Sequence, residues 1–335
     1  MQLLTVSGSP HIHSTQNVKS IMYGVVIAMI PAMMVSIYFF GLDAARVFLI
    51  SILACLFFEW VIQKYLIKGS VTINDGSALV TGVLLAFNVP ANLPAWILII
   101  GALAAIGIAK MSFGGLGKNP FNPALVGRVF LLVSFPVQMT TWPKPHGLYA
   151  AQAPDALTGA TTLGFFKEGL TRGETVQQVM QNPEFPGYLN DFLGAQGGSL
   201  GEVSVIALLL GAAYLFIRKI ITWHIPVSYL ASAFIFSGIL WLIDPTKFID
   251  PVMHLLAGGM ILGIFYMATD MVSSPITAKG QLIFGTGAGL LTIIIRVWGV
   301  YPEGVSFAIL IMNAFTPLIN IAFKPRRFGE RLAHG

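Results

Sequence analysis

The sequence predicts an all-α integral membrane protein of about ten transmembrane helices, arranged as two inverted five-helix repeats with short and broken helices. Three observations predict this class. Hydrophobic residues make up 56% of the 335 and charged residues only 10%, whereas a soluble domain carries about 25% charged residues. Apolar runs of membrane-spanning length recur along the chain. In each half, two of these runs are short or interrupted by glycine and proline at matching places.

The expected membrane segments fall into two groups of five. They cover residues of about 20–40, 45–63, 77–89, 94–110, 123–136, 202–217, 225–243, 252–269, 282–298 and 305–323. The chain therefore divides into a first membrane repeat, an intervening loop, a second membrane repeat and a tail, which cover residues 1–136, 137–200, 201–323 and 324–335. The opening residues lack the basic region of a cleaved signal peptide, so we expect the first run to remain as a span.

The basic residues predict the orientation of the chain. Of the 19 lysines and arginines, 12 fall on the side that holds both termini and five on the other, while Arg128 and Arg296 lie in or at the ends of spans. Cytoplasmic loops carry the excess of positive charge, so we expect cytoplasmic termini and an outward-facing 137–200 loop. Because these charges gather at membrane edges, the net charge of +5 does not indicate nucleic acid. The single cysteine excludes a disulfide framework and any Cys-rich metal site within this chain.

The short runs suggest an internal repeat. "DGSALVTGVLLAFNVP" and "NPALVGRVFLLVSF" are too short to cross about 30 Å of hydrocarbon easily. In the second half, "HLLAGGMILGIFYMATDMVSSP" and the run after "YPEG" stand in the corresponding places. An odd number of spans per repeat makes the second copy inverted, and such interrupted spans mark a buried site near the midplane. Chance similarity between two apolar halves is the alternative.

The first motif with chemical potential is "FGGLGKNPFNPALVGRVFLL", at residues 113–132. Its prolines prevent a regular helix, and non-helical backbone at membrane depth lines a cavity or is buried in protein. Asn119 and Asn122 offer amides, and Lys118 and Arg128 bring positive charge. A cavity lined by the two amides, three residues apart, suits a polar heterocycle such as a flavin ring. The alternatives are that the amides cap helices in a re-entrant loop, and that Arg128 snorkels to the interface.

The second motif is "DALTGATTL", at residues 155–163 in the polar loop. Gly159 and Ala160 leave the Thr161 hydroxyl sterically open to another enzyme. A threonine hydroxyl can form a phosphoester, through which flavin mononucleotide (FMN) could be attached. The alternative is structural, with Thr158 or Thr161 as the N-cap of a short helix. No catalytic residue is predicted in this chain.

The two motifs, in this order, resemble the family that contains the B subunit of the Na⁺-translocating NADH:quinone reductase and the D subunit of the Rnf complex. The resemblance covers the whole chain. It implies FMN on Thr161, the last threonine of the motif, installed by a flavin transferase. It also implies a second, non-covalent flavin, riboflavin or FMN, contacted by Asn119 and Asn122.

"SGSPHI" and the short N-terminal region favour the Rnf branch of this family. That branch implies an electron-carrying translocase subunit that is active only within its complex. The complex exchanges electrons between ferredoxin and NAD⁺ and moves Na⁺ or H⁺ across a bacterial or archaeal cytoplasmic membrane. The expected partners are iron–sulfur subunits, a second subunit with covalent flavin, and the lipid bilayer.

The remaining polar residues leave several interpretations open. Glu59, Asp75 and Asp270 are candidates for a cation path, although Glu59 could instead pair with Lys64 or Lys68 at the interface. No metal site is predicted. The alternative functions are a B-type quinone reductase subunit and a redox-silent channel, because inverted five-span halves also resemble urea- and ammonium-type channels. A third option is a structural scaffold subunit.

Overall fold

The computed structural model describes residues 17–69, 71–145, 147, 159, 161–183, 185, 187–194, 196–202 and 204–324, and these contain helices and loops but no β-strand. The predicted all-helical class is confirmed. Five helical stretches in this part of the chain are long and apolar enough to cross a membrane. They are α1 with η1 (Val18–Val61, Ile62–Ile67), α3 with η3 and η4 (Ala95–Leu103, Ala104–Lys110, Met111–Phe113), α10 (His224–Ile243), α13 (Ala278–Trp298) and α14 (Val305–Ala322).

Shorter helices complete the membrane part and the segment between its halves. Three short apolar helices are α2 (Ser77–Phe87), α4 (Pro123–Ser134) and α9 (Val205–Ile217). The other short elements are η2 (Ile73–Asp75), α5 (Pro136–Thr140), α6 (Thr162–Thr171), α7 (Val176–Met180), α8 (Gly187–Leu193), α11 (Pro251–Leu256), α12 (Met260–Leu262) and η5 (Gly263–Met267).

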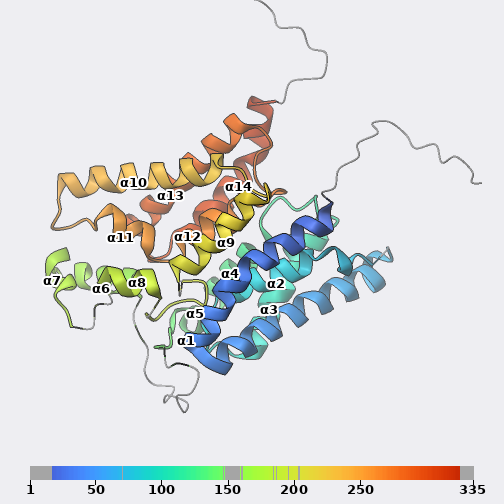
Figure 1. Ribbon diagram of the computed structural model, residues 1–335, viewed down its shortest axis with the longest axis horizontal. Helices are drawn as coiled ribbons and strands as arrows, with labels where there is room; N and C mark the ends of the chain where they lie inside the picture. Colours follow the sequence, from blue (N-terminus) through green and yellow to red (C-terminus); the bar gives the residue numbers. More distant parts are fainter. Residues whose placement is uncertain are drawn as a thin grey trace, which may run out of the picture.

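Helix α1 contains two of the predicted runs. Gly41 interrupts it with φ 59° and ψ −141°, a conformation that glycine adopts because it has no Cβ. The chain turns back at this point, so the second arm runs in roughly the opposite direction to the first (Figure 1). Each arm has roughly the 20 residues that a membrane crossing needs.

Glycines also break the predicted run at 252–269. Helix α11 ends at Leu256, and α12 begins at Met260. Gly258 and Gly259 between them have φ values of 70° and 61°. The buried side chain of Arg296, from α13, donates to the carbonyls of Ala257 at 2.8 Å and Gly258 at 3.1 Å. These bonds satisfy carbonyl groups that the helix end would otherwise leave without partners.

The two halves pack on each other through α1 with α9 and through α4 with α14. Within the halves, α1 packs on α2, and α13 packs on α10 and α14. Helices α6, α7 and α8 lie at one end of the bundle (Figure 1). The contact of α1 with α9 is close at Gly211, where an added Cβ would lie 1.9 Å from the Ala28 carbonyl oxygen.

Candidate functional site

A cavity of about 1330 Å³ lies between α6–α7 and the adjoining end of the helix bundle. We call it the large cavity. Aromatic side chains form part of its wall, and charged and hydroxyl side chains form another part. The aromatic residues are Tyr38, Phe39, Trp142, Phe165, Phe185 and Tyr301, and the polar ones include Arg128, Lys144, Thr161, Glu168 and Glu303. A cavity of this size and mixed lining can hold a large ligand with an apolar ring and charged substituents.

Thr161 lies at the start of α6 and lines the large cavity. Its Oγ1 accepts a hydrogen bond from the Gly164 N–H at 3.1 Å, so Thr161 is the N-cap of the helix. The expectation that a threonine of this motif caps a short helix is therefore confirmed for Thr161. Its side chain is buried against protein, but the cavity reaches it. The cap uses an oxygen lone pair and leaves the hydroxyl hydrogen free for other chemistry.

The residues around Thr161 hold the motif in place. The Gly159 N–H donates to the Trp142 carbonyl at 2.8 Å. A Cβ at Gly159 would lie 3.1 Å from Lys144 Cγ and 3.6 Å from Gly197 Cα, so a larger residue there would crowd both neighbours. Thr158 and Ala160, the other two motif positions, lie outside the described residues.

A buried carboxyl group lies beside the motif. Thr162 Oγ1 is 2.6 Å from Asp191 Oδ1, and Asp191 is fully buried in α8. Burial raises the pKa of Asp191 to about 6, and the negative charge of Glu202 acts in the same direction, while the bond from Thr162 opposes them. Asp191 Oδ2 has no hydrogen-bond partner among the described residues. The segment that carries Thr161 is thus attached to a carboxyl group whose pKa is raised to about 6.

Arg128 lies on the wall of the large cavity and links three helices. Its Nη1 donates to Asn88 Oδ1 at the end of α2 and to Ser306 Oγ in α14, both at 2.9 Å. Its Nη2 forms an ion pair with Glu303, just before α14. The guanidinium is buried among these partners, so the snorkelling alternative is wrong. The sequence indicated the charge but not its partner Glu303, which lies in the other half of the chain.

A second, much smaller cavity of about 80 Å³ lies at the start of α4. We call it the small cavity. Asn119 and Asn122 line it, together with Lys110 and Asp270. Asn122 is the N-cap of α4: its Oδ1 accepts from the N–H groups of Ala124 and Leu125, and its Nδ2 donates to the Met267 carbonyl at 3.3 Å. The expectation that an amide here caps a helix is confirmed.

Asn119 differs from Asn122 in that only the nitrogen of its side-chain amide forms a hydrogen bond among the described residues. Its Nδ2 donates to the Phe121 carbonyl at 3.0 Å. Its Oδ1 has no partner among the described residues, although the side chain is 3% exposed. A buried acceptor without a donor is costly, so this oxygen marks a place where a ligand or a mobile donor can bind.

The four polar residues of the first motif do not all line one cavity. Arg128 lies six residues along α4 from Asn122, roughly 9 Å along a helix axis, and lines the large cavity instead. Lys118 is exposed and does not line the small cavity. The cation that does line it is Lys110. The sequence carries no signal for this role, because Lys110 lies at the end of an apolar run, where a lysine at the membrane edge is ordinary.

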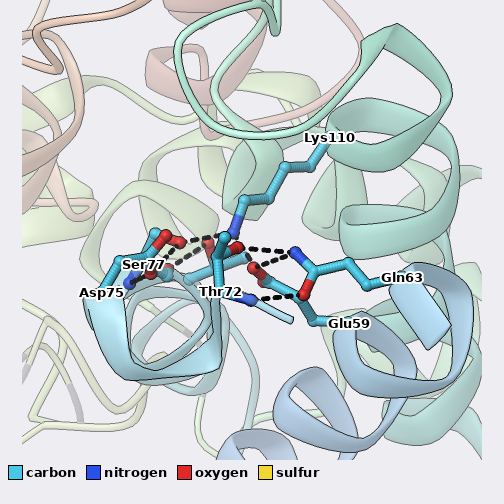
Figure 2. Close-up of polar contacts among 7 residues, drawn as sticks. Glu59, Gln63, Thr72, Asp75, Ser77 and Lys110 are labelled. Atoms are coloured by element: carbon cyan, nitrogen blue, oxygen red, sulfur yellow. Dashed lines mark hydrogen bonds and ion pairs between the residues drawn. The ribbon is translucent and has the colours of Figure 1, made fainter. Parts of the chain in front are cut away.

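Lys110 belongs to a buried ionic cluster at the start of α2 (Figure 2). Its Nζ lies 2.5 Å from Glu59 Oε2 and 2.6 Å from Ser77 Oγ. The interpretation that Glu59 pairs with Lys64 or Lys68 is therefore wrong. Lys64 instead lies over the Trp60 ring, with its Nζ 4.7 Å from the centroid.

The two aspartates considered for a cation path both lie beside these features. Asp75 is half-buried, and its Oδ1 accepts from the Ser77 N–H at 2.7 Å and from Ser77 Oγ at 2.6 Å. Asp270 lines the small cavity, and its Oδ2 accepts from Ser273 Oγ at 2.8 Å. Within the described ranges, no three or more His, Cys, Asp or Glu side chains gather as a metal site.

The chain resembles known proteins over nearly its whole length. Residues 5–329 match the model of the NQR2, RnfD, RnfE family. It is 46% identical over 330 residues to the D subunit of a Na⁺-translocating ferredoxin:NAD⁺ oxidoreductase complex from Acetobacterium woodii, covering 97% of this chain and 95% of the relative. It is 44% identical over 332 residues to the D subunit of a proton-translocating complex of the same kind from Clostridium ljungdahlii, covering 98% and 97%.

A third relative is the D subunit of an ion-translocating oxidoreductase complex from Pectobacterium carotovorum, 39% identical over 356 residues that cover 97% of this chain and 99% of the relative. The names of the first two relatives differ in the ion, and all three names describe the D subunit of an ion-translocating oxidoreductase complex. On the family match and these identities, the chain belongs to the NQR2, RnfD, RnfE family.

Proposed function

We propose that this chain is the D-type subunit of an ion-translocating ferredoxin:NAD⁺ oxidoreductase, and that it carries FMN in phosphoester linkage on Thr161. The observation that carries the proposal is the position of Thr161, whose hydroxyl caps α6 and also lines the large cavity of about 1330 Å³. The names of the relatives support the kind of complex.

The geometry at Thr161 is compatible with a phosphoester. The Gly164 N–H binds a lone pair of Oγ1, whereas esterification replaces the hydroxyl hydrogen, so the cap and the linkage can coexist. The attached phosphate would lie at the N-terminus of α6, a helix of 10 residues. The partial positive charge of a helix N-terminus stabilises a phosphate there.

The lining of the large cavity suits the rest of the cofactor. The aromatic side chains of Tyr38, Phe39, Trp142, Phe165 and Tyr301 offer faces and edges against which a flat ring can pack. Arg128 and Lys144 provide positive charge on the same wall. When bound, the flavin supplies electron transfer, and the protein contributes position and polarity.

A second flavin, riboflavin or FMN, is part of the proposal through the resemblance of the Asn119 and Asn122 motif. The unpartnered Oδ1 of Asn119 offers it a hydrogen-bond acceptor. The small cavity of about 80 Å³ is well below the roughly 300–1,000 Å³ of most ligand pockets. Binding of a flavin ring there therefore requires the cavity to open.

The proposal includes an arrangement in the membrane. The chain would form ten spans in two inverted five-helix repeats, similar to urea transporters, in a bacterial or archaeal cytoplasmic membrane. The bias of lysine and arginine supports cytoplasmic termini and an outward-facing segment 137–200. Its partners would be the other subunits of the complex, including iron–sulfur subunits and a second subunit with covalent flavin, a flavin transferase for maturation, and Na⁺ or H⁺ as the transported ion.

The attachment is tested by the flavin fluorescence of the denatured chain on a gel, after coexpression with its flavin transferase. The unaltered chain is expected to fluoresce. Thr161→Ala is expected to abolish the band, because the alanine has no oxygen to esterify. Thr161→Ser keeps an oxygen at the same place and is expected to retain some of the signal. Undiminished fluorescence in Thr161→Ala would rule out this attachment site.

A further inference from the structure

The pair of Glu59 and Lys110 is among the most buried ionic contacts in the described chain. Both side chains are 1% exposed, and their charged atoms lie 2.5 Å apart. Taking two charges out of water is expensive, and the attraction between them does not by itself make such a pair stabilising. Ionisable groups inside a membrane protein are by default a functional hypothesis.

The local helix geometry is unusual at both members of this pair. Glu59 lies in the last turn of α1, directly before the π-helical segment η1, and Lys110 is the final residue of the π-helical segment η3. Short π-helical segments within α-helices are rare and are frequent at functional sites. The two irregular segments therefore meet at the ion pair.

Two oxygen atoms, from Glu59 and Ser77, contact the ammonium group, and further polar contacts extend from each of them (Figure 2). Ser77 Oγ contacts Lys110 Nζ at 2.6 Å and donates to Asp75 Oδ1 at 2.6 Å. On the other side, Gln63 Nε2 donates to Glu59 Oε1 at 3.3 Å and to Thr72 Oγ1 at 2.7 Å. Thr72 is exposed and Asp75 is half-buried, so the cluster reaches the surface at these two residues.

Lys110 also has an alternative place for its charge. It lines the small cavity together with Asn119 and Asp270. Asn119 Oδ1 is buried without a partner among the described residues, and the Asp270 carboxyl is an acceptor on the same cavity. A lysine ammonium sits on a flexible stem with three rotatable donors. Its side chain can therefore exchange Glu59 and Ser77 for acceptors on the small cavity.

We propose that Glu59, Ser77 and Asp75 form a binding site for an alkali cation, and that the Lys110 ammonium occupies it in this structure. When Lys110 turns toward the small cavity, it leaves carboxylate and hydroxyl oxygens, the ligands that hard cations such as Na⁺ prefer. The incoming ion replaces the positive charge beside Glu59. The exchange places one additional positive charge at the small cavity.

This exchange links the ion to the small cavity. Any negative charge that enters the small cavity favours Lys110 there and thereby favours the ion at Glu59. By reciprocity, an ion at Glu59 favours negative charge at the small cavity by the same factor. The role of this site in translocation rests on the proposed function. The binding of the ion does not, because it can be measured without turnover.

The test is the thermal stability of the purified native complex, titrated with NaCl against choline chloride at constant ionic strength. An ion that binds only the folded protein raises its stability with concentration. Lys110→Met removes the competing ammonium, so half-maximal stabilisation is expected at about one tenth of the Na⁺ concentration that the unaltered complex needs. Glu59→Gln combined with Lys110→Met is expected to abolish the response. Lys64→Met, which removes an exposed lysine five residues after Glu59, serves as the control. Its response to Na⁺ is expected to match that of the unaltered complex.

The proposal is overturned if the assembled Lys110→Met complex responds to Na⁺ no more strongly than the unaltered one. It is also overturned if the double variant keeps the response, or if the response follows pH and not Na⁺. Should Lys110→Met fail to assemble, Asp75→Asn in the otherwise unaltered chain is expected to raise the required Na⁺ concentration severalfold, and an unchanged value overturns the proposal. The flavin fluorescence of the same preparations reports separately on Thr161, so the two proposals can fail independently.

Discussion

The large cavity and the small cavity lie near different parts of one short helix, α4, and differ in what they can hold. The large cavity, about 1330 Å³, lies beside Arg128 of α4. It is lined by aromatic side chains and by Thr161, the N-cap of α6. The small cavity, about 80 Å³, lies beside Asn122 at the start of α4 and has an unpartnered amide oxygen and a buried lysine. The first has room for a cofactor, and the second has room for little more than a side chain or a few waters.

The positive charges of the two cavities are held differently. Arg128 is bound to Glu303, Asn88 and Ser306 at once, and its planar group is suited to such fixed, multiple bonds. Lys110 is bound to Glu59 and Ser77 and lines a cavity with further acceptors. The comparison indicates that the arginine fixes the framework of the large cavity, whereas the lysine can move.

The largest effect is expected from removing the carboxylate that pairs with Arg128, the fixed charge. Glu303→Gln leaves the buried Arg128 without its carboxylate partner, which for a buried pair costs roughly 3–5 kcal/mol. We expect the thermal midpoint of the purified protein to fall sharply. Glu168→Gln is the matched control, because its pair with Arg172 is about 60% exposed on both sides and such pairs contribute roughly 0–1 kcal/mol. Equal losses in the two variants would contradict the proposed framework role.

A smaller effect is expected from Asp191, which ties the Thr161 segment to α8. Its pKa of about 6 exceeds the ordinary 3.8, so the folded state binds more protons between these pH values than the unfolded state does. The stabilisation by this proton is complete below about pH 4 and is lost as pH rises through about 6. A shift of this size corresponds to at most about 3 kcal/mol.

Asp191→Asn removes this titration. The thermal stability of the variant, minus that of the unaltered protein, is expected to rise between pH 4 and pH 7 and then to level off. Taking the difference removes the contributions of all other titrating groups. A difference that is constant across this pH range would show that Asp191 does not titrate there.

The smallest of these effects is expected at the packing that closes the small cavity. Tyr266 lines this cavity, and its hydroxyl donates to the Leu208 carbonyl at 2.8 Å. Gly211→Ala would place a Cβ 2.1 Å from that hydroxyl and 1.9 Å from the Ala28 carbonyl oxygen. Overpacking of this kind costs about 1–3 kcal/mol. Gly117→Ala, at a position with open space around it but a φ of 89°, is the control for backbone strain alone, and a loss as large as that of Gly211→Ala would contradict a packing effect.

Periodic and local features of this molecule could be predicted from the sequence. The apolar runs predicted the long helices, and the amide and hydroxyl residues before Pro123 and Thr162 predicted caps, because capping depends on residues only a few positions apart. The apolar runs indicated two helices here. They did not show that a single residue, Gly41, reverses the chain between the two arms of α1.

Contacts between distant segments could not be predicted in this way. Glu59 and Lys110 are 51 positions apart, and each lies near the end of its own apolar run, where an interfacial charge is the ordinary interpretation. Arg128 and Glu303 come from different halves of the chain. No spacing rule connects such residues, so the sequence did not indicate Glu303 as the partner of Arg128, and the pairing that it suggested for Glu59, with Lys64 or Lys68, is wrong.

The most direct test of the account is the intact mass of this chain, isolated from its native complex in the presence of its flavin transferase. We expect the polypeptide mass plus one FMN less water, with the modified peptide containing Thr161. An unmodified polypeptide mass would contradict the central claim that Thr161, the helix-capping threonine on the large cavity, carries a flavin.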